Sequence, residues 1–329
     1  MMISGGSLLV SLVRLVDSLP FPPPPVRRKR GRQQTYSEQL IVKALVVMII
    51  RRLYTAWALL AFLQQEDPVV QQLRPLLTEN GQFPTRRTWD RRLAALPATL
   101  PGLIGRLGRA LVTALNPWAQ QGHGAACDST AVRAHGGVWH KKDREAGVVP
   151  HTSIDTEAHW SKSGWHGWWY GWKLHLAVSL GSLWIPLAAE FTAANVADSE
   201  VAPLLLTQLP AEVRYVLGDQ HYNTPDLRAE CSRHNRALVA TRRGPYPHTD
   251  GGVEVRRVFH QLRSQAIEPF NGLFKNIFEW GGQMPVKGLR RCQLLALGAV
   301  LLYQLVLLYQ HQHHHHPVGV GIKALLRAA

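Results

Sequence analysis

The sequence predicts an α/β protein in which a mixed five-stranded sheet, flanked by helices, follows an all-helical N-terminal segment. Two observations lead to this prediction. Apolar residues recur at the spacing of helices over residues 36–116. From Ala125 onward, short β-prone runs alternate with helical runs and with turn residues.

The first 35 residues contain a proline run at Pro22–Pro25 and a basic run, VRRKRGR, at Val26–Arg32. Prolines favour extended polyproline II and the basic run is solvated, so we expect residues 1–35 to form a flexible arm. Two roles remain open for this arm. It is either a disordered tail or a phosphate-binding segment that becomes ordered on its partner.

Residues 36–116 contain four helical runs, and Ser37 is a suitable N-cap for the first. Between two of these runs lies FPTRRTWDRRLAAL at 83–96, where Thr85 can cap a helix. This helix displays four arginines: Arg86, Arg87, Arg91 and Arg92. Residues at the start of a recognition helix contact base edges in helix-turn-helix proteins, so the pattern predicts a DNA-binding helix. A solvated basic helix is the alternative.

The second half of the chain begins with three strand patterns, at 125–132, 169–180 and 183–192. The turn Gly181–Ser182 joins the last two as a hairpin. The elements expected next are a helix at 198–209, a strand at 215–217, a helix at 225–235 opened by Thr224 and Pro225, a strand at 237–241, and helices at 264–278 and 289–311. A meander of three strands followed by helix, strand, helix, strand and helix is the order of a ribonuclease-H-like fold.

The chain carries a net charge of +15, from 37 Lys and Arg against 22 Asp and Glu. This excess suits a polyanionic partner, although a membrane surface or a ribosome would attract it too. Three widely spaced cysteines without a C-x-x-C pair favour a reducing cytoplasm. Polar residues interrupt the apolar stretches at 8–19, 42–63 and 294–309, so we expect buried helices and no membrane span.

Three carboxylates stand in local contexts that suit metal binding. Asp128 lies in a strand pattern, Asp219 ends a short apolar strand, and Glu268 lies on an amphipathic helix. Two or three hard oxygen ligands on rigid elements can hold Mg²⁺ or Mn²⁺ ions about 3.5–4 Å apart for phosphoryl transfer. We expect the first and fourth strands to pair in parallel and to bring the two aspartates together.

The strings around these acids resemble, in order, the DDE-type transposases of bacterial insertion sequences. They are YGWKLH at 170–175, NVADSE at 195–200, LGDQHYNTPDL at 217–227, and Glu268 followed seven residues later by Lys275. The resemblance covers about 125–309. It implies the ribonuclease-H-like fold, a triad of Asp128, Asp219 and Glu268 that binds two Mg²⁺ or Mn²⁺ ions, and DNA cleavage and strand transfer. The chain departs from the family pattern where Gln261 and Ser264 replace a Tyr and an Arg that often precede the Glu.

Several other side chains are candidates for supporting roles. Lys275 is expected to face the DNA backbone, and Tyr222 to brace the turn after Asp219. Arg263 lies one residue from the family's usual arginine and is a DNA-contact candidate. Lys173 and His175 share one strand face, which we expect beside Asp128, with a DNA-contact or a structural role. Two further acids, Asp198 and Asp226, are excluded from catalysis, because each stands in the first turn of a predicted helix and complements its dipole. Glu190 ends a strand and could lie near the site.

The insert at 134–168 has an unusual composition. Six of the 11 tryptophans lie from Trp139 to Trp172, mixed with lysines and five histidines. Exposed aromatics with cations fit stacking on unpaired bases. A packed surface loop is an equal alternative, and a zinc site at His135 and His140 is a third. The tail at 311–329, with its histidine tract, is expected to be solvated.

These observations predict a bacterial, cytoplasmic and nucleoid-associated transposase. Residues 36–116 would bind DNA, and residues 120–310 would form the catalytic domain. The partners would be the terminal inverted repeats of the element and target DNA, bound by a homodimer without a membrane. An inactive DNA-binding descendant and another ribonuclease-H-like DNA nuclease are the alternatives. The intact acidic triad argues against the first, because a DNA binder gains nothing from acids near phosphates.

Overall fold

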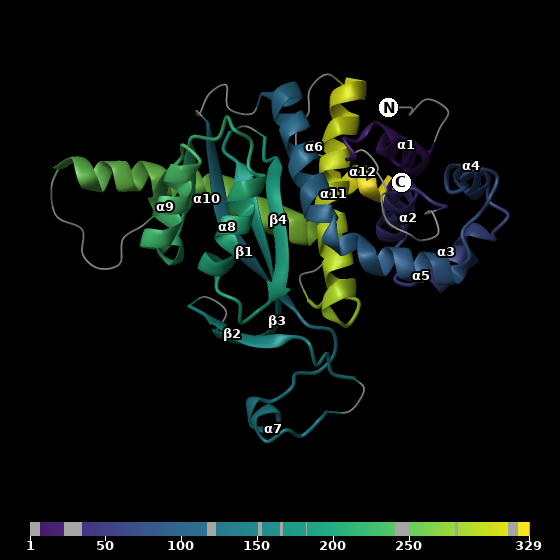
Figure 1. Ribbon diagram of the computed structural model, residues 1–329, viewed down its shortest axis with the longest axis horizontal. Helices are drawn as coiled ribbons and strands as arrows, with labels where there is room; N and C mark the ends of the chain where they lie inside the picture. Colours follow the sequence, from purple (N-terminus) through teal and green to yellow (C-terminus); the bar gives the residue numbers. More distant parts are fainter. Residues whose placement is uncertain are drawn as a thin grey trace, which may run out of the picture.

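The protein has a mixed β-sheet with helices on both faces and a group of N-terminal helices at one end (Figure 1). The structure is a computed structural model, and it describes residues 7–22, 35–116, 123–150, 153–164, 167–181, 183–240, 250–279, 282–314 and 322–328. The tryptophan-rich insert projects from the end of the sheet and carries the short helix α7 (Lys141–Glu145).

The sheet has the strand order β4–β3–β1–β5–β6, with β2 added beside the first half of β3. The strands are β1 (Gly124–Arg133), β2 (His159–Ser163), β3 (Gly167–Ser179), β4 (Pro186–Ala193), β5 (Tyr215–Gly218) and β6 (Ala237–Ala240). β3 pairs antiparallel with β1, whereas β5 pairs parallel with β1, as predicted. This order is consistent with a ribonuclease-H-like domain. The prediction of five strands is wrong by one, because β2 forms inside the insert, where no strand was expected.

Helices cover both faces of the sheet. α8 (Asp198–Gln208) and α9 (Pro225–Arg233) lie on one face, and α10 (Asp250–Phe278) crosses the other face against β1, β3 and β5 (Figure 1). Thr224 caps α9 as predicted, since its hydroxyl accepts a hydrogen bond from the Leu227 N–H at 3.2 Å. α10 begins well before its predicted start at Ser264.

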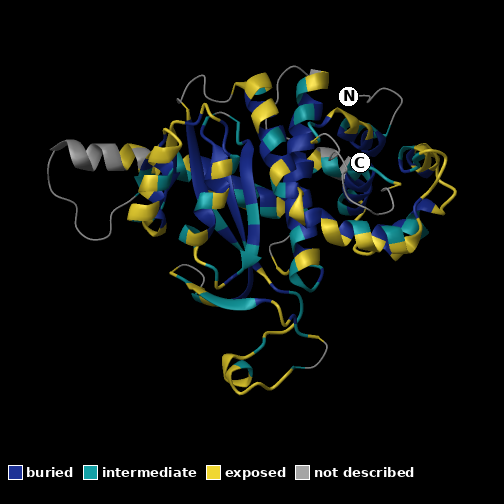
Figure 2. Cartoon of the chain, in the orientation of Figure 1, coloured by how far each residue is buried: buried dark blue, intermediate teal, exposed yellow. Residues whose placement is uncertain are grey.

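The N-terminal helices share one core with the rest of the chain. They are α1 (Leu8–Leu15), α2 (Glu38–Ile50), α3 (Ala56–Leu63), α4 (Pro68–Leu76), α5 (Arg86–Ala95) and α6 (Leu100–Leu115). α1, α2 and α5 pack against α11 (Leu289–His314), and α6 packs against both α11 and β4. Buried residues therefore run without a break from the N-terminal helices into the sheet (Figure 2).

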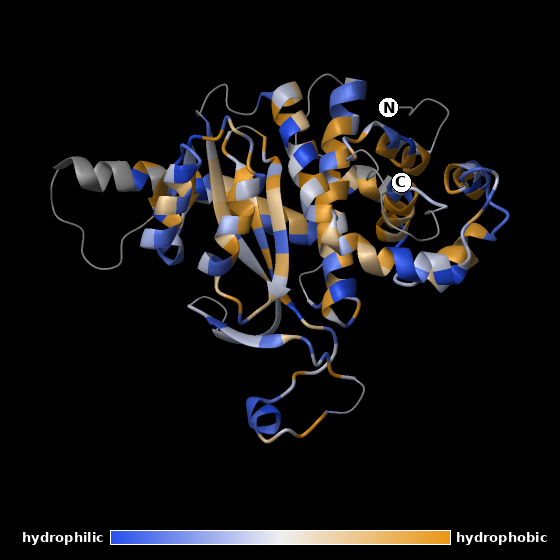
Figure 3. Ribbon diagram, viewed as in Figure 1, coloured by the Kyte–Doolittle hydropathy of each residue, from blue (hydrophilic) through white to orange (hydrophobic). Residues whose placement is uncertain are grey.

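Part of the predicted flexible arm is an ordered helix. Leu9, Leu12 and Val13 of α1 are fully buried, because the apolar face of α1 packs on α2 and α4 (Figure 3). Lys43 and Asp17 add an ion pair at 2.8 Å. The expectation of a buried helix at 8–19 is therefore confirmed, and the assignment of all residues 1–35 to an arm is wrong for this stretch. The basic run at 26–32 lies outside the described residues.

α11 is the core helix of the protein. Among the described helices it alone is long and apolar enough to cross a membrane by length and composition, with a mean hydropathy of 1.9. Its most apolar window is 89% buried inside the protein. Its N-terminus is capped by the insert, where Asp155 accepts a hydrogen bond from the Gly288 N–H at 2.9 Å and Glu157 accepts one from the Leu289 N–H.

Candidate active site

Asp128 and Asp219 belong to the ends of two neighbouring strands. Asp128 is in β1, and Asp219 directly follows β5. The parallel register pairs Ala126 with Leu217, two residues before each aspartate. The negative charge of Asp219 is near enough to contribute to the raised pKa of Asp128.

Glu268 is brought to the same region through Arg263, and both residues belong to α10. Nη1 of Arg263 lies 3.3 Å from Oδ2 of Asp128, and Nη2 lies 3.4 Å from Oε1 of Glu268. The hydroxyl of Ser264 donates to the same Glu268 oxygen at 3.3 Å. One guanidinium group therefore connects the strand carboxylate to the helix carboxylate.

The Asp128 carboxyl has a strongly shifted pKa. Burial raises its pKa from 3.8 to about 6, because a buried carboxylate loses hydration. The Arg263 guanidinium opposes the rise, as does the Ser129 backbone N–H, which donates to Oδ1 of Asp128 at 2.8 Å. The negative charges of Asp219 and Asp198 add to the rise. A nearby cation would therefore favour the ionised form of Asp128.

The three acids suit a hard cation by their chemistry. All are carboxylates, the ligand type that Mg²⁺ and Mn²⁺ prefer. Two of them already share one positive group, the guanidinium of Arg263. Within the described residues, no three His, Cys, Asp or Glu side chains are close enough together to count as a preformed metal site. The three side chains therefore have the ligand type that a divalent ion needs, and Arg263 lies between Asp128 and Glu268.

The turn after β5 depends on a close contact between Gly218 and Tyr222. Oδ1 of Asp219 accepts a hydrogen bond from the His221 N–H at 2.8 Å and caps the 3₁₀ turn Gln220–Tyr222. Tyr222 is fully buried, and a Cβ on Gly218 would lie 2.6 Å from the Tyr222 Cβ. Gly218 is therefore needed for this turn, a role that the sequence reasoning missed.

Lys173 and His175 lie on the sheet face opposite to Asp128. His175 pairs with Ser129 across the β1–β3 ladder, and neighbouring residues of a strand point to opposite faces. His175 is completely buried, and Lys173 forms an ion pair with Asp198 at 2.9 Å. The expectation that Lys173 and His175 lie beside Asp128 is therefore wrong, and their contacts on the face covered by α8 fit the structural role that was the alternative to DNA contact.

Asp198 is the centre of a half-buried polar network on that face. Its Oδ2 accepts from the Ser129 hydroxyl at 2.9 Å, and its Oδ1 accepts from the Lys173 ammonium at 2.9 Å. His175 Nδ1 lies 3.6 Å from Oδ1. Burial lowers the pKa of His175 to about 4, so this imidazole is neutral at pH 7. Asp198 starts α8 as expected, but its side chain does much more than complement the helix dipole.

The other predicted contact residues fall into two groups. On α5, Arg86, Arg87 and Arg91 are exposed while Trp89 and Leu93 are buried, as the amphipathic pattern requires. Arg92 is half-buried, and burial lowers its pKa. On α10, Lys275 is also half-buried, and burial lowers its pKa.

Among the described tryptophans from Trp139 to Trp172, most are packed and Trp168 is exposed, while Trp165 lies outside the described residues. Trp169 and Trp172 are buried, and Trp160 packs against Tyr170 with ring centroids 5.4 Å apart. Trp168 is 62% exposed, with the Lys162 ammonium 5.8 Å from its ring. The packed alternative thus describes most of this cluster.

The insert histidines have separate surroundings. His135 Nδ1 lies 3.0 Å from the Met284 carbonyl oxygen, and His159 Nε2 lies 2.8 Å from Arg144 Nη2. His151 and His166 lie outside the described residues.

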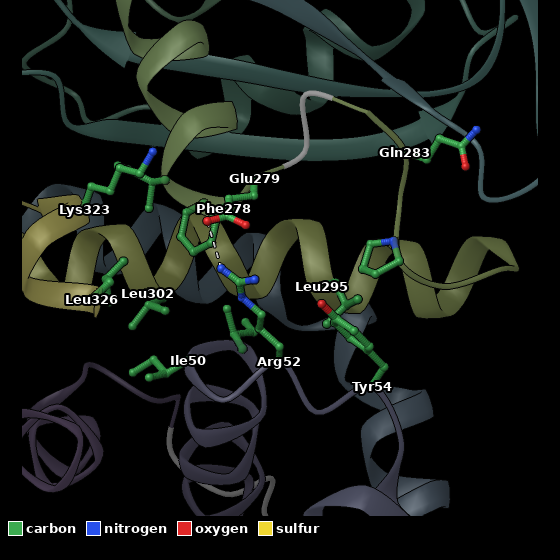
Figure 4. A pocket seen from close by; sticks show the side chains of 13 residues that line it. Ile50, Arg52, Tyr54, Phe278, Glu279, Gln283, Leu295, Leu302, Lys323 and Leu326 are labelled. Carbon is green, nitrogen blue, oxygen red and sulfur yellow. Dashed lines mark ion pairs between the residues drawn. The ribbon is translucent and has the colours of Figure 1, made fainter. Parts of the chain in front are cut away.

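A separate cavity lies where the N-terminal helices meet the end of α10. Its lining includes Arg52, Tyr54, Glu279 and Lys323 with apolar side chains from α2, α10, α11 and α12 (Ile322–Ala328) (Figure 4). Arg52 and Glu279 form an ion pair across it at 2.9 Å. The three candidate acids do not line this cavity, so it is distinct from the candidate active site.

Comparison with known proteins finds a family match over the region that contains this site. Residues 120–305 match the model of the transposase DDE domain family. Neither the curated proteins nor the solved structures contain a match. The matched region extends from just before β1 to the middle of α11 and includes all three candidate acids.

Proposed function

The chain belongs to the transposase DDE domain family, and we propose that it cleaves DNA at the ends of an insertion sequence and transfers the cut strand to target DNA. One observation carries the proposal for the site. Asp128 and Asp219 belong to the ends of the paired strands β1 and β5, and Arg263 contacts both Asp128 and Glu268. These contacts support a common site for the three acids.

Asp128, Asp219 and Glu268 would hold divalent ions, Mg²⁺ or Mn²⁺ and two in number. When bound, such ions lower the pKa of a bound water and stabilise the attacking and leaving oxygens of an in-line displacement at phosphorus. Asp128 acts in its ionised form, and the Ser129 backbone N–H holds its Oδ1 in place. Asp219 is fixed by the His221 N–H, so the two strand acids have defined directions before substrate arrives.

The exposed arginines of α5 and the half-buried Lys275 would bind phosphates. DNA is the partner that the family implies, and +15 net charge supports its binding. Two copies of the chain would hold the two ends of the element. Replacing Arg86 and Arg87 with Ala tests α5. Loss of preference for end DNA would support base contacts, whereas equal weakening on all sequences with a flatter salt dependence would support phosphate contacts.

The decisive experiment measures cleavage of a labelled duplex that carries the terminal repeat. Asp128→Ala, Asp219→Ala and Glu268→Ala should each reduce cleavage by more than about a thousandfold, because the site acts as one unit. Each variant should still retard the same duplex in a gel. The matched control is Asp226→Ala, which removes an exposed acid from the first turn of α9 and should cleave normally. Full cleavage by any triad variant would refute the proposed site.

A further inference from the structure

We propose that Arg263 is a positioning residue that holds Asp128 and Glu268 in the metal-free protein and competes with the divalent ion for them. This inference rests on the proposed function, because it needs a metal bound by those two acids. This positioning role differs from the DNA contact that the sequence predicts for Arg263. In the metal-free protein, the guanidinium occupies the oxygens that the ion would use.

The contacts of Arg263 show that it stands between the acids. Its side chain is only 12% exposed, and its two terminal nitrogens reach different carboxylates, one on β1 and one on α10. Residues five positions apart on a helix point about 140° away from each other. Arg263 and Glu268 therefore do not share a helix face. Only the length of the arginine side chain lets it reach both acids.

The same contacts show that the guanidinium is held loosely. Its two hydrogen bonds, 3.3 and 3.4 Å, are longer than the usual 2.7–2.9 Å of charge-assisted bonds. Neither carboxylate is held in a bidentate pair. The Nε atom is buried, and no hydrogen-bond partner for it is present in the described part of the chain. An unsatisfied buried donor favours a second arrangement in which this group finds an acceptor.

The charges explain why Arg263 and a divalent ion would compete for the same two acids. Asp128 and Glu268 carry two negative charges when ionised, and Arg263 supplies one positive charge to both. A divalent ion between them would neutralise both acids and repel the guanidinium. Arg263 would then have to move away from Asp128 Oδ2 and Glu268 Oε1. Removing its charge should therefore strengthen metal binding while weakening the metal-free site.

The test compares wild type with Arg263→Met, which removes the charge and keeps most of the side-chain volume. Ca²⁺ binding is measured by calorimetry at pH 7.5 without DNA. We expect Arg263→Met to bind Ca²⁺ roughly tenfold more tightly. In EDTA this variant should melt below wild type, and saturating Ca²⁺ should raise its melting temperature more than that of wild type. Arg263→Lys should bind Ca²⁺ with intermediate affinity, because one ammonium cannot contact both acids.

Arg257→Met is the matched control, since Arg257 is an exposed arginine on the same helix. It should leave Ca²⁺ affinity unchanged. Two outcomes would overturn the inference and separate its failure from that of the proposed function. If Asp128→Asn abolishes Ca²⁺ binding and Arg263→Met binds Ca²⁺ no more tightly than wild type, only the role of Arg263 is refuted. Absence of Ca²⁺ binding in every variant would refute the metal site as well.

Discussion

Two clusters of acids and cations lie on opposite faces of β1, and they are built differently. The outer cluster is Asp128, Arg263 and Glu268, on the face toward α10. The inner network is Ser129, Asp198 and Lys173, on the face toward α8. Adjacent residues of one strand, Asp128 and Ser129, belong to the two clusters because side chains alternate along a strand.

The two clusters differ in how completely their acids are paired. In the inner network each oxygen of Asp198 has its own donor at 2.9 Å, and the side chains of Asp198 and Lys173 are 14% and 16% exposed. In the outer cluster two acids share one cation at 3.3 and 3.4 Å, and Glu268 is 56% exposed. The outer cluster has a deficit of positive charge, which a metal ion can correct. The inner network has no such deficit, because Lys173 balances the charge of Asp198.

The largest effect expected from this comparison is on stability, at Asp198. Asp198→Ala should lower the free energy of unfolding by about 3 kcal/mol, because it leaves the half-buried Lys173 ammonium without its counterion. Urea denaturation followed by circular dichroism measures this change. Asp226 is also an acid in the first turn of a helix, but it is exposed. Asp226→Ala should therefore lower the free energy of unfolding by less than about 1 kcal/mol. Similar losses for both variants would show that the inner network adds nothing beyond helix capping.

The second prediction concerns the pH dependence that the outer cluster imposes. The pKa of Asp128 is raised to about 6 in the folded protein. Between about pH 4 and 6 the folded state therefore binds more protons than the unfolded state, and this group destabilises the protein as pH rises. Asp128→Asn lacks this effect, so its stability relative to wild type should increase by on the order of 2 kcal/mol between pH 4 and 7 in EDTA.

The measurement is a set of urea titrations of both proteins at several pH values. His175, whose pKa is lowered, stabilises the folded protein as pH rises, and this opposite contribution cancels in the difference between the two proteins. A difference that does not change with pH would show that Asp128 is not desolvated in the folded protein.

The comparison also shows what the sequence could and could not predict. The motif order predicted Asp128, Asp219 and Glu268 as the site, and the ribonuclease-H-like arrangement predicted the parallel pairing of β1 with β5, which the structure confirms. The faces of Lys173 and His175 could not be predicted, because they depend on which residue of β1 faces each one across the β1–β3 ladder. Short motifs predict which residues form a site, but they do not show which residues of neighbouring strands pair with each other.

The same reason explains the other differences. Asp198 looked like a simple helix-start acid, since its partners Ser129 and Lys173 are distant in sequence and lie on other strands. β2 was missed because its own residues, 159–163, lie in the insert, whose mixture of tryptophans, lysines and histidines shows no strand pattern. The buried helix at 8–19 was expected from its apolar residues, but the arm was given bounds that include it, because α1 is short and its stability comes from packing on α2 and α4.

The smallest expected effect tests whether the two clusters are independent. Ser129 contacts both: its backbone N–H donates to Asp128, and its hydroxyl donates to Asp198. Ser129→Ala removes only the second contact, so it should cost about 1 kcal/mol of stability and leave Ca²⁺ affinity and cleavage within about twofold of wild type. Urea titration, calorimetry and the cleavage assay measure the three quantities on the same preparation. If cleavage fell tenfold or more while the protein stayed folded, the inner network would be setting the direction of Asp128, and the two clusters would not be independent.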